Sequence, residues 1–241
     1  MTAARTVKPR LLVVELWGLG DLILAPPFRR AATQRFDVTL LAKPHAAQMR
    51  PHFWPEVTVI PFTAPWTSFR HKYQLWRWPW RVIYGLRQHL HEENFAVAVS
   101  VRRDPRDHCI MFCIGATERL GFARLGSQRL LTQPLVHPAP EAHRYQYWVV
   151  AARALGIELP TQNPLGPARR KGDRRILLHT GAGQPIRSWP LPRYRNLAQR
   201  LRQNGYYVVV ACDPNQRAWW EQAGEREVRT PGSVEIGRAH V

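Results

Sequence analysis

The chain has 241 residues, 45% of them hydrophobic, which suits one large domain or two modest ones with ordinary buried cores. No apolar run approaches the ~20 residues of a membrane-spanning helix, and the apolar stretch after residue 10 is too short and strand-like for a signal peptide. We therefore expect a cytoplasmic protein, whose net charge of +18 indicates either an anionic partner or an arginine-rich solvated surface. Three cysteines without histidines at zinc spacing are predicted to be reduced thiols: Cys109, Cys113 and Cys212.

The first unit predicted along the chain is a strand, a glycine turn and a helix. Residues 11–14 form an apolar run typical of a strand buried on both faces. Gly18, Gly20 and Asp21 follow, and helical spacing then continues through Arg35. This layout brings backbone amides at a helix N-terminus to a ligand.

A hydride-transfer cofactor site is not expected at this turn. The dinucleotide fingerprint needs a third glycine where Ile23 stands, and Lys43 follows the second strand in place of the acid that binds a ribose. Asp21 remains as an acidic group at the edge of the strand. Its alternative role is a helix N-cap, which is frequent for aspartate at such turns.

The run from Leu12 to Phe28, LVVELWGLGDLILAPPF, resembles the N-terminal signature of the heptosyltransferases, glycosyltransferase family 9. These inverting enzymes add sugars to the lipopolysaccharide core. The resemblance implies an α/β fold of the GT-B type, in which a Rossmann-like N-terminal domain binds the acceptor and a second Rossmann-like domain binds a nucleotide-sugar. It also implies that Asp21 is the catalytic base and that Gly18 and Gly20 lie on the acceptor side.

Strands and helices alternate further along the chain, which predicts a parallel sheet with helices on both faces. The predicted strands are residues 36–42, 57–61, 95–101 and 119–122, and the predicted helices include residues 46–53 and 109–115. Residues 119–122, Arg-Leu-Gly-Phe, also match a short strand signature of the resembled family.

Residues 65–90 mix tryptophans with cations. Trp66, Trp76, Trp78 and Trp80 interleave with arginine, lysine and histidine. Such a mixture suits single-stranded nucleic acid or a membrane interface, and it also suits a loop and an amphipathic helix that pack on the sheet. We expect packing first, and the resemblance favours the membrane as the alternative.

A charged cluster follows the strand at residues 95–101, where sites of open α/β sheets lie. Its members are Arg102, Arg103, Asp104, Arg106 and Asp107. Arg102, Arg103 and Asp104 are candidates for binding a phosphorylated acceptor, with a surface ion-pair network as the alternative. By resemblance His143, which heads a predicted helix ending at Gly156, is another acceptor-side candidate, although a histidine there can be structural.

A second glycine turn follows a segment rich in proline and charge at residues 160–173, which we interpret as a linker. The strand at residues 175–179 leads into Thr180, Gly181, Ala182 and Gly183, and Arg187 follows. This segment resembles the donor-binding turn of the family, with Thr180 in place of the usual proline and Arg187 in place of the usual lysine. These five residues are the candidates for binding the donor diphosphate.

The predicted domains are residues 10–159 and an incomplete second domain at residues 174–234, with a strand at 207–211 and a helix at 213–223. Residues 235–241, EIGRAHV, are expected to be a non-native tail, because they translate the start of a common sequencing adapter. We therefore expect these 241 residues to transfer no sugar themselves.

The resemblance implies an inverting, metal-independent glycosyltransferase at the cytoplasmic face of the inner membrane. It would move a heptose-like sugar from a nucleotide-sugar, such as ADP-heptose, to a lipopolysaccharide-core or related anionic glycolipid acceptor, without a cofactor. The sequence has no Asp-x-Asp pair, the usual metal-diphosphate clamp of the other glycosyltransferase fold. The alternatives are a basic nucleic-acid-binding protein and a non-catalytic sugar-nucleotide-binding relative.

Overall fold

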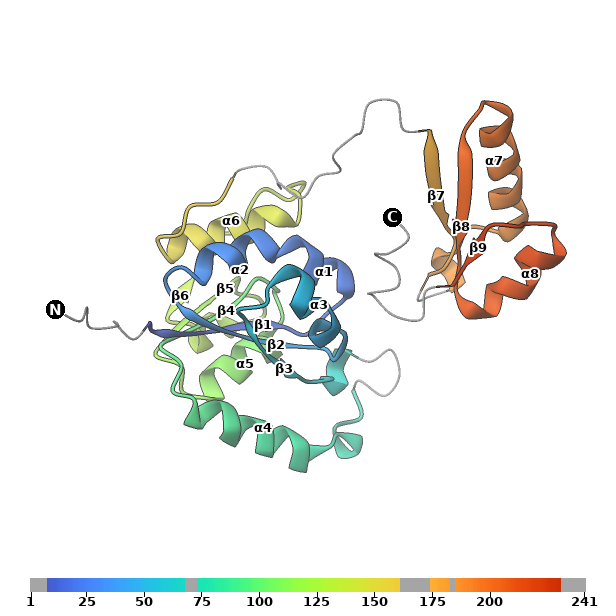
Figure 1. Ribbon diagram of the computed structural model, residues 1–241. Helices are drawn as coiled ribbons and strands as arrows, with labels where there is room; N and C mark the ends of the chain where they lie inside the picture. Colours follow the sequence, from blue (N-terminus) through green and yellow to red (C-terminus); the bar gives the residue numbers. More distant parts are fainter. Residues whose placement is uncertain (1–7, 68–72, 161–173, 183–184, 231–241) are drawn as a thin grey trace. The chain divides into compact units, whose positions relative to one another are not determined.

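The computed structural model describes residues 8–67, 73–160, 174–182 and 185–230 (Figure 1). The chain divides into two compact units, Met1–Gly166 and Pro167–Val241. Gly183, the predicted tail at residues 235–241 and the predicted linker beyond Pro160 lie outside the described residues.

The first unit contains a six-stranded parallel sheet in the order β3-β2-β1-β4-β5-β6. The strands are β1 (Arg10–Glu15), β2 (Asp37–Ala42), β3 (Thr58–Pro61), β4 (Val97–Ser100), β5 (Glu118–Gly121) and β6 (Gln133–Pro134). This is the strand order of a doubly wound sheet. Strands β2 and β3 are added on one side of β1, and the chain then returns to add β4, β5 and β6 on the other side. Ligand sites of such sheets lie beyond the carboxyl ends of the two strands at this reversal, here β1 and β4.

Helices cover both faces of this sheet. They are α1 (Leu19–Leu24), α2 (Pro26–Ala32), α3 (His45–Phe53), α4 (Trp80–Glu92), α5 (Pro105–Cys113) and α6 (Tyr145–Ala154). Figure 1 shows α1, α2, α3 and α6 on one face and α4 and α5 on the other. The predicted parallel sheet with two helical layers is thus confirmed.

The core is centred on β1, as the apolar run predicts. Residues 11–14 are all fully buried. Leu12 and Val14 belong to a core cluster with Leu90 and Met111, which come from α4 and α5. Side chains alternate along a strand, so Leu11 and Val13 serve the opposite helical layer.

The helix predicted to run through Arg35 is instead two helices, α1 and α2, which meet at Ala25. Pro26 and Pro27 occupy the first positions of α2. A proline has no backbone N–H to continue the preceding helix, but its fixed φ suits the start of a new one.

The second unit has three parallel strands in the order β7-β8-β9. They are β7 (Arg175–His179), β8 (Tyr207–Ala211) and β9 (Val228–Arg229), with α7 (Leu191–Gln203) and α8 (Arg217–Gln222) between them. A small core joins Val210, Cys212 and Trp220. The predicted strands at 175–179 and 207–211 are confirmed residue by residue.

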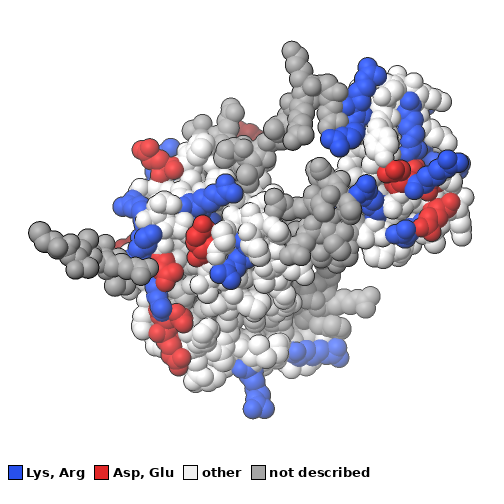
Figure 2. All heavy atoms as spheres, viewed as in Figure 1, with Lys and Arg blue, Asp and Glu red and all other residues white. Residues whose placement is uncertain are grey.

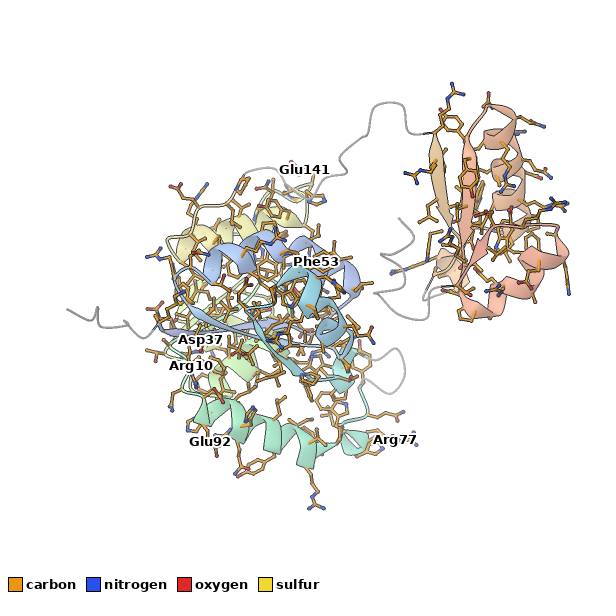
Figure 3. The ribbon with its side chains drawn as sticks, in the orientation of Figure 1. Arg10, Asp37, Phe53, Arg77, Glu92 and Glu141 are labelled. Atoms are coloured by element: carbon orange, nitrogen blue, oxygen red, sulfur yellow. The ribbon has the colours of Figure 1, made fainter. Side chains whose placement is uncertain are left out.

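Charges are spread over the described surface. Figure 2 shows lysine and arginine over both units, interspersed with aspartate and glutamate, on the face drawn. Arg10 and Asp37 stand opposite each other at the N-terminal ends of β1 and β2, with Nε of Arg10 4.0 Å from Oδ2 of Asp37 (Figure 3). This ion pair lies at the end of the sheet away from the glycine turn.

Candidate active site

Asp21 lies at the carboxyl edge of the sheet, where three separate segments meet. Its carboxylate is 3.4 Å from Nη1 of Arg102, which follows β4, and 3.4 Å from Nε of Arg144, which precedes α6. The Asp21 side chain is 22% exposed. Strong charge-assisted hydrogen bonds measure about 2.7–2.9 Å, so these looser contacts leave the carboxylate oxygens able to accept a further hydrogen bond.

Asp21 is not the N-cap of α1, so that alternative was wrong. The N-cap is Gly18, in extended conformation, and Asp21 stands in the first turn of the helix. A negative charge in the first turn is favourable because it faces the positive end of the helix dipole. The Asp21 side chain is turned toward Arg102 and Arg144.

Aromatic rings orient both arginines. The Arg102 guanidinium lies 4.1 Å from the centre of the Trp17 ring, and the Arg144 guanidinium lies 5.0 Å from the Tyr147 ring. A guanidinium over an aromatic face gains a cation–π attraction. The ring gives each guanidinium a second contact besides the one with Asp21.

Beside Asp21 lies a pocket of about 270 Å³, which we call the arginine pocket. It is lined by Trp17, Arg102, Arg103, Asp104, Arg106, Arg124 and Arg144. Five arginines against one aspartate give the pocket a strong positive charge. Guanidinium groups bind carboxylate and phosphate in a two-pronged way, so the pocket suits an anionic group.

Asp104 organises this pocket. Its carboxylate caps α5 by accepting from the Arg106 backbone N–H at 3.0 Å, and it also accepts from Nε and Nη2 of Arg106 at 2.8 and 2.7 Å. Burial alone would raise the pKa of Asp104, but the bonds and the charge of Arg106 outweigh it and lower that pKa. Asp104 therefore positions Arg106 and has little bonding capacity left for a ligand.

Two buried carboxyl groups lie beneath the site. Glu15, the last residue of β1, is 1% exposed, and neither of its side-chain oxygens has a hydrogen-bond partner among the described residues. Burial, with the negative charges of Asp21 and Asp107, raises the pKa of Glu15 to about 8. Asp107 is also fully buried and accepts from Ser100 Oγ at 3.2 Å, and burial raises its pKa to about 7.

A buried cation, Arg29, lies in the helical layer formed by α1, α2, α3 and α6 (Figure 1). Arg29 of α2 is fully buried, stacks 3.9 Å from the Trp54 ring and donates to the Leu22 carbonyl. Burial lowers the pKa of Arg29 to about 9, so the guanidinium is still charged at neutral pH. It ties α2 to the end of α1, the helix that carries Asp21.

The other acceptor-side candidates are placed as follows. Arg102 and Arg103 line the arginine pocket. Gly18 and Gly20 stand at the start of α1, and a Cβ on Gly18 would lie 3.9 Å from the Asp21 carboxylate. His143 is exposed, and its Nδ1 accepts a hydrogen bond of 3.2 Å from the backbone N–H of Tyr145, the first residue of α6.

Sequence reasoning missed two arginines of the pocket and the buried Glu15. Arg144 is the neighbour of His143 at the predicted helix start, and it is Arg144 that lines the pocket. Arg124 follows β5 and carried no recognised signal of its own.

In the second unit, the predicted donor turn follows β7. Thr180 is buried, and its hydroxyl donates to Gln216 at 2.9 Å and accepts from the Trp220 indole at 3.3 Å. This hydroxyl therefore anchors the turn to the following segment. Arg187 ends a short 3₁₀ helix (Pro185–Arg187) and is exposed.

Gly181 is tightly packed against an acidic side chain. A Cβ added there would lie 2.3 Å from Oδ1 of Asp213, which follows β8. Ala182, the next residue of the turn, is half-buried. A side chain at position 181 of the turn would therefore require the Asp213 carboxylate to shift.

We expect Gly181→Ala to destabilise the second unit by about 1–3 kcal/mol, because the added methyl group must push the Asp213 carboxylate aside. Urea unfolding, followed by the fluorescence of the tryptophans, measures this loss. The double variant with Asp213→Ala should recover most of it. An equal loss in the single and double variants would contradict the proposed clash.

No group of three or more His, Cys, Asp or Glu side chains that could hold a metal ion is found among the residues described.

No family model matches the chain, and no curated protein matches it. Several solved structures are similar. E. coli heptosyltransferase WaaC with ADP-2-deoxy-2-fluoro heptose is 18% identical with a TM-score of 0.69, covering 94% of this chain and 78% of that one. A family 9 glycosyl transferase from Veillonella parvula is 18% identical with a TM-score of 0.64, covering 95% and 70%. E. coli ADP-heptose lps heptosyltransferase II is 17% identical with a TM-score of 0.63, covering 91% and 71%.

These similarities extend over nearly the whole chain and include three heptosyltransferase or family 9 structures. The prediction of an α/β fold of the GT-B type is thus confirmed. The chain has the fold of the GT-B glycosyltransferases, with Asp21 at the sheet edge of its first Rossmann-like unit.

Proposed function

We propose that the chain serves an inverting, metal-independent glycosyl transfer, in which a heptose-like sugar moves from a nucleotide-sugar to a lipopolysaccharide-core or related glycan. The observation that carries the proposal is the Asp21 carboxylate, partly exposed at the sheet edge and bordered by the arginine pocket. A general base must lie within hydrogen-bond reach of the acceptor hydroxyl, and a pocket that binds an anionic acceptor beside Asp21 would place that hydroxyl there.

In the proposed reaction, Asp21 accepts the proton of an acceptor hydroxyl while the oxygen of that hydroxyl bonds to the anomeric carbon of the donor sugar. The bond between that carbon and the diphosphate breaks in the same step, which inverts the configuration. Arg102 and Arg144 hold the carboxylate from two sides, and the remaining arginines of the pocket hold the anionic group of the acceptor.

The proposed donor site is the turn from Thr180 to Gly183 together with Arg187. Backbone amides and a cation at this turn would stabilise the negative charge that develops on the departing diphosphate. The buried Thr180 hydroxyl holds the turn in place. ADP-heptose is the proposed donor because two of the similar structures are named for ADP-heptose or an analogue of it.

Acceptor binding can be tested directly. We expect Arg103→Gln to weaken the binding of deacylated lipopolysaccharide core by about 10- to 100-fold, because one charge-assisted contact contributes roughly 1.5–3 kcal/mol. Arg153→Gln, on the exposed side of α6 and outside the pocket, is the matched control. Tighter, salt-sensitive binding of single-stranded DNA than of the core fragment would instead favour the nucleic-acid alternative.

We also propose that the protein associates peripherally with the cytoplasmic face of the inner membrane. The tryptophans of residues 65–90 divide into two groups. Trp66 and Trp78 pack in the core cluster with ring centres 5.4 Å apart, which is the packing expected first. Trp76 is 77% exposed and Trp80 is 52% exposed, and these two are the candidates for the membrane. No helix of the described chain is long and apolar enough to span a bilayer.

The membrane prediction concerns Trp76. The chain should sediment with anionic vesicles and be released as salt rises, because exposed indoles and arginines favour an anionic lipid surface. Trp76→Ala should reduce the sedimented fraction several-fold. Trp189→Ala, which removes an indole of 41% exposure from the second unit, should leave it unchanged. Equal sedimentation of all three proteins would show that Trp76 does not face lipid.

A further inference from the structure

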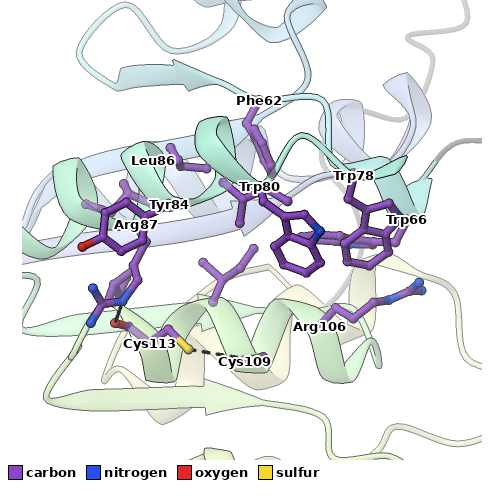
Figure 4. A pocket seen from close by; sticks show the side chains of 14 residues that line it. Phe62, Trp66, Trp78, Trp80, Tyr84, Leu86, Arg87, Arg106, Cys109 and Cys113 are labelled. Carbon is purple, nitrogen blue, oxygen red and sulfur yellow. Dashed lines mark hydrogen bonds between the residues drawn. The ribbon is translucent and has the colours of Figure 1, made fainter. Parts of the chain in front are cut away.

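An apolar groove of about 370 Å³ runs between α4 and α5, on the opposite side of the sheet from α1 and α2 (Figures 1 and 4). A volume of this size is within the range of small-molecule sites. The side chains that form it come from α4, α5 and the segment before α4. They include Phe62, Trp66, Trp78, Ile83, Leu90 and Ile110.

The lining is suited to hydrocarbon. Apart from two arginines, the phenol of Tyr84 and two thiols, every lining side chain is aliphatic or aromatic. A sugar or a nucleotide would find few hydrogen-bond partners here, and polar groups buried without partners are costly. A flexible hydrocarbon chain needs none.

Arginines lie at both ends of the groove, as Figure 4 shows. At one end, Arg87 of α4 donates to the Cys113 carbonyl of α5 at 3.1 Å. At the other end, the guanidinium of Arg106 lies 5.9 Å from the centre of the Trp66 ring and donates a hydrogen bond to Asp104. Arg106 also lines the arginine pocket, so the apolar groove and the anion-binding pocket adjoin at one side chain.

We propose that the groove binds the hydrocarbon chain of an anionic lipid whose head group lies in the arginine pocket. The charge of the pocket selects the head group, and the apolar groove that begins at Arg106 selects the chain. That this lipid is the sugar acceptor rests on the proposed function, whereas lipid binding by the groove does not. Lipid binding itself can be measured without a donor and without transfer.

The groove contains two native chemical probes. Cys109 and Cys113 are exposed lining residues on α5, with their sulfur atoms 3.8 Å apart, whereas Cys212 is buried in the second unit. A bound chain should shield the first two thiols. Burial and the neighbouring Cys113 raise the pKa of Cys109, so the alkylation is best run at pH 8.5.

The experiment measures the rate of N-ethylmaleimide addition to each cysteine by mass spectrometry. We expect dodecyl phosphate, below its micelle concentration, to slow the alkylation of Cys109 and Cys113 by at least about tenfold. Inorganic phosphate and uncharged dodecyl maltoside at equal concentration should not. Each added methylene should tighten binding by about fourfold, so decyl phosphate should bind about 15-fold more tightly than octyl phosphate.

Two variants locate the chain. Ile110→Trp fills the groove and should abolish the protection, whereas Val82→Trp, on the exposed side of α4, should preserve it. If Ile110→Trp fails to fold, wild type supplies a second measurement. A brominated alkyl phosphate should quench the fluorescence of the groove tryptophans, and an unbrominated one should not.

Three results would overturn the proposal: no protection by any alkyl phosphate, equal protection by dodecyl maltoside, or equal protection by inorganic phosphate. Such a failure would leave the proposed transfer through Asp21 unaffected. Conversely, lipid binding by a protein that transfers no sugar would contradict only the proposed function.

Discussion

Asp21→Asn, made in the full-length protein, should lower the transfer rate by at least ~100-fold while leaving the unfolding temperature nearly unchanged. An amide cannot accept the hydroxyl proton, and loss of a general base costs about 10²–10⁴-fold. The two ion pairs at 3.4 Å are partly exposed, and such pairs contribute only about 0–1 kcal/mol to stability. The measurement is the rate of nucleoside diphosphate release, with circular dichroism for stability.

Asp37→Asn is the matched control for this variant. Asp37 is an exposed aspartate paired with Arg10 at the opposite end of the sheet, so its loss should leave transfer unchanged. Near-normal turnover of Asp21→Asn would show that Asp21 only pairs with the two arginines and does not take part in the reaction.

Glu15→Gln should stabilise the protein at neutral and alkaline pH. The pKa of Glu15 rises from 4.5 to about 8 in the folded protein, chiefly because the carboxyl is buried. The fold therefore prefers the protonated form, and stability is lost progressively as the pH rises from about 4.5 to about 8. At pH 7 the loss amounts to about 3 kcal/mol. Glutamine keeps the shape of the neutral acid and avoids this loss.

Urea unfolding of both proteins at pH 4.5, 6 and 8 measures the difference. It should be close to zero at pH 4.5 and should grow to several kcal/mol at pH 8. Asp107, whose pKa is also raised by burial, is present in both proteins, and its negative charge is one of the causes that raise the pKa of Glu15. Glu118→Gln, at an exposed glutamate of β5, is the matched control. A difference independent of pH would mean that Glu15 ionises in the fold without cost.

The sequence pattern was sufficient for most of the fold because buried parallel strands leave a strong local signal. The runs that became β1, β7 and β8 are short, apolar and followed by turns. The break between α1 and α2 was missed although its cause, Pro26 followed by Pro27, is visible in the sequence. Helical spacing on both sides of the prolines concealed the break.

The site was predicted only in part, because its charges come from segments far apart in the chain. Asp21 was singled out through its glycine turn, whereas Arg144 contacts it from 123 positions away in the sequence, and that contact exists only in the folded protein. The raised pKa of Glu15 likewise follows from complete burial beside other carboxylates. A single glutamate at the end of a strand does not reveal this in advance.

The stereochemistry of transfer tests the central claim most directly. The full-length protein is incubated with a nucleotide-sugar of defined anomeric configuration and deacylated lipopolysaccharide core, and the product is examined by NMR. We predict a new glycosidic bond of opposite configuration, formed by wild type and by Asp37→Asn but not at a comparable rate by Asp21→Asn. Retained configuration, or equal product formation by Asp21→Asn, would contradict base-assisted inversion at this site.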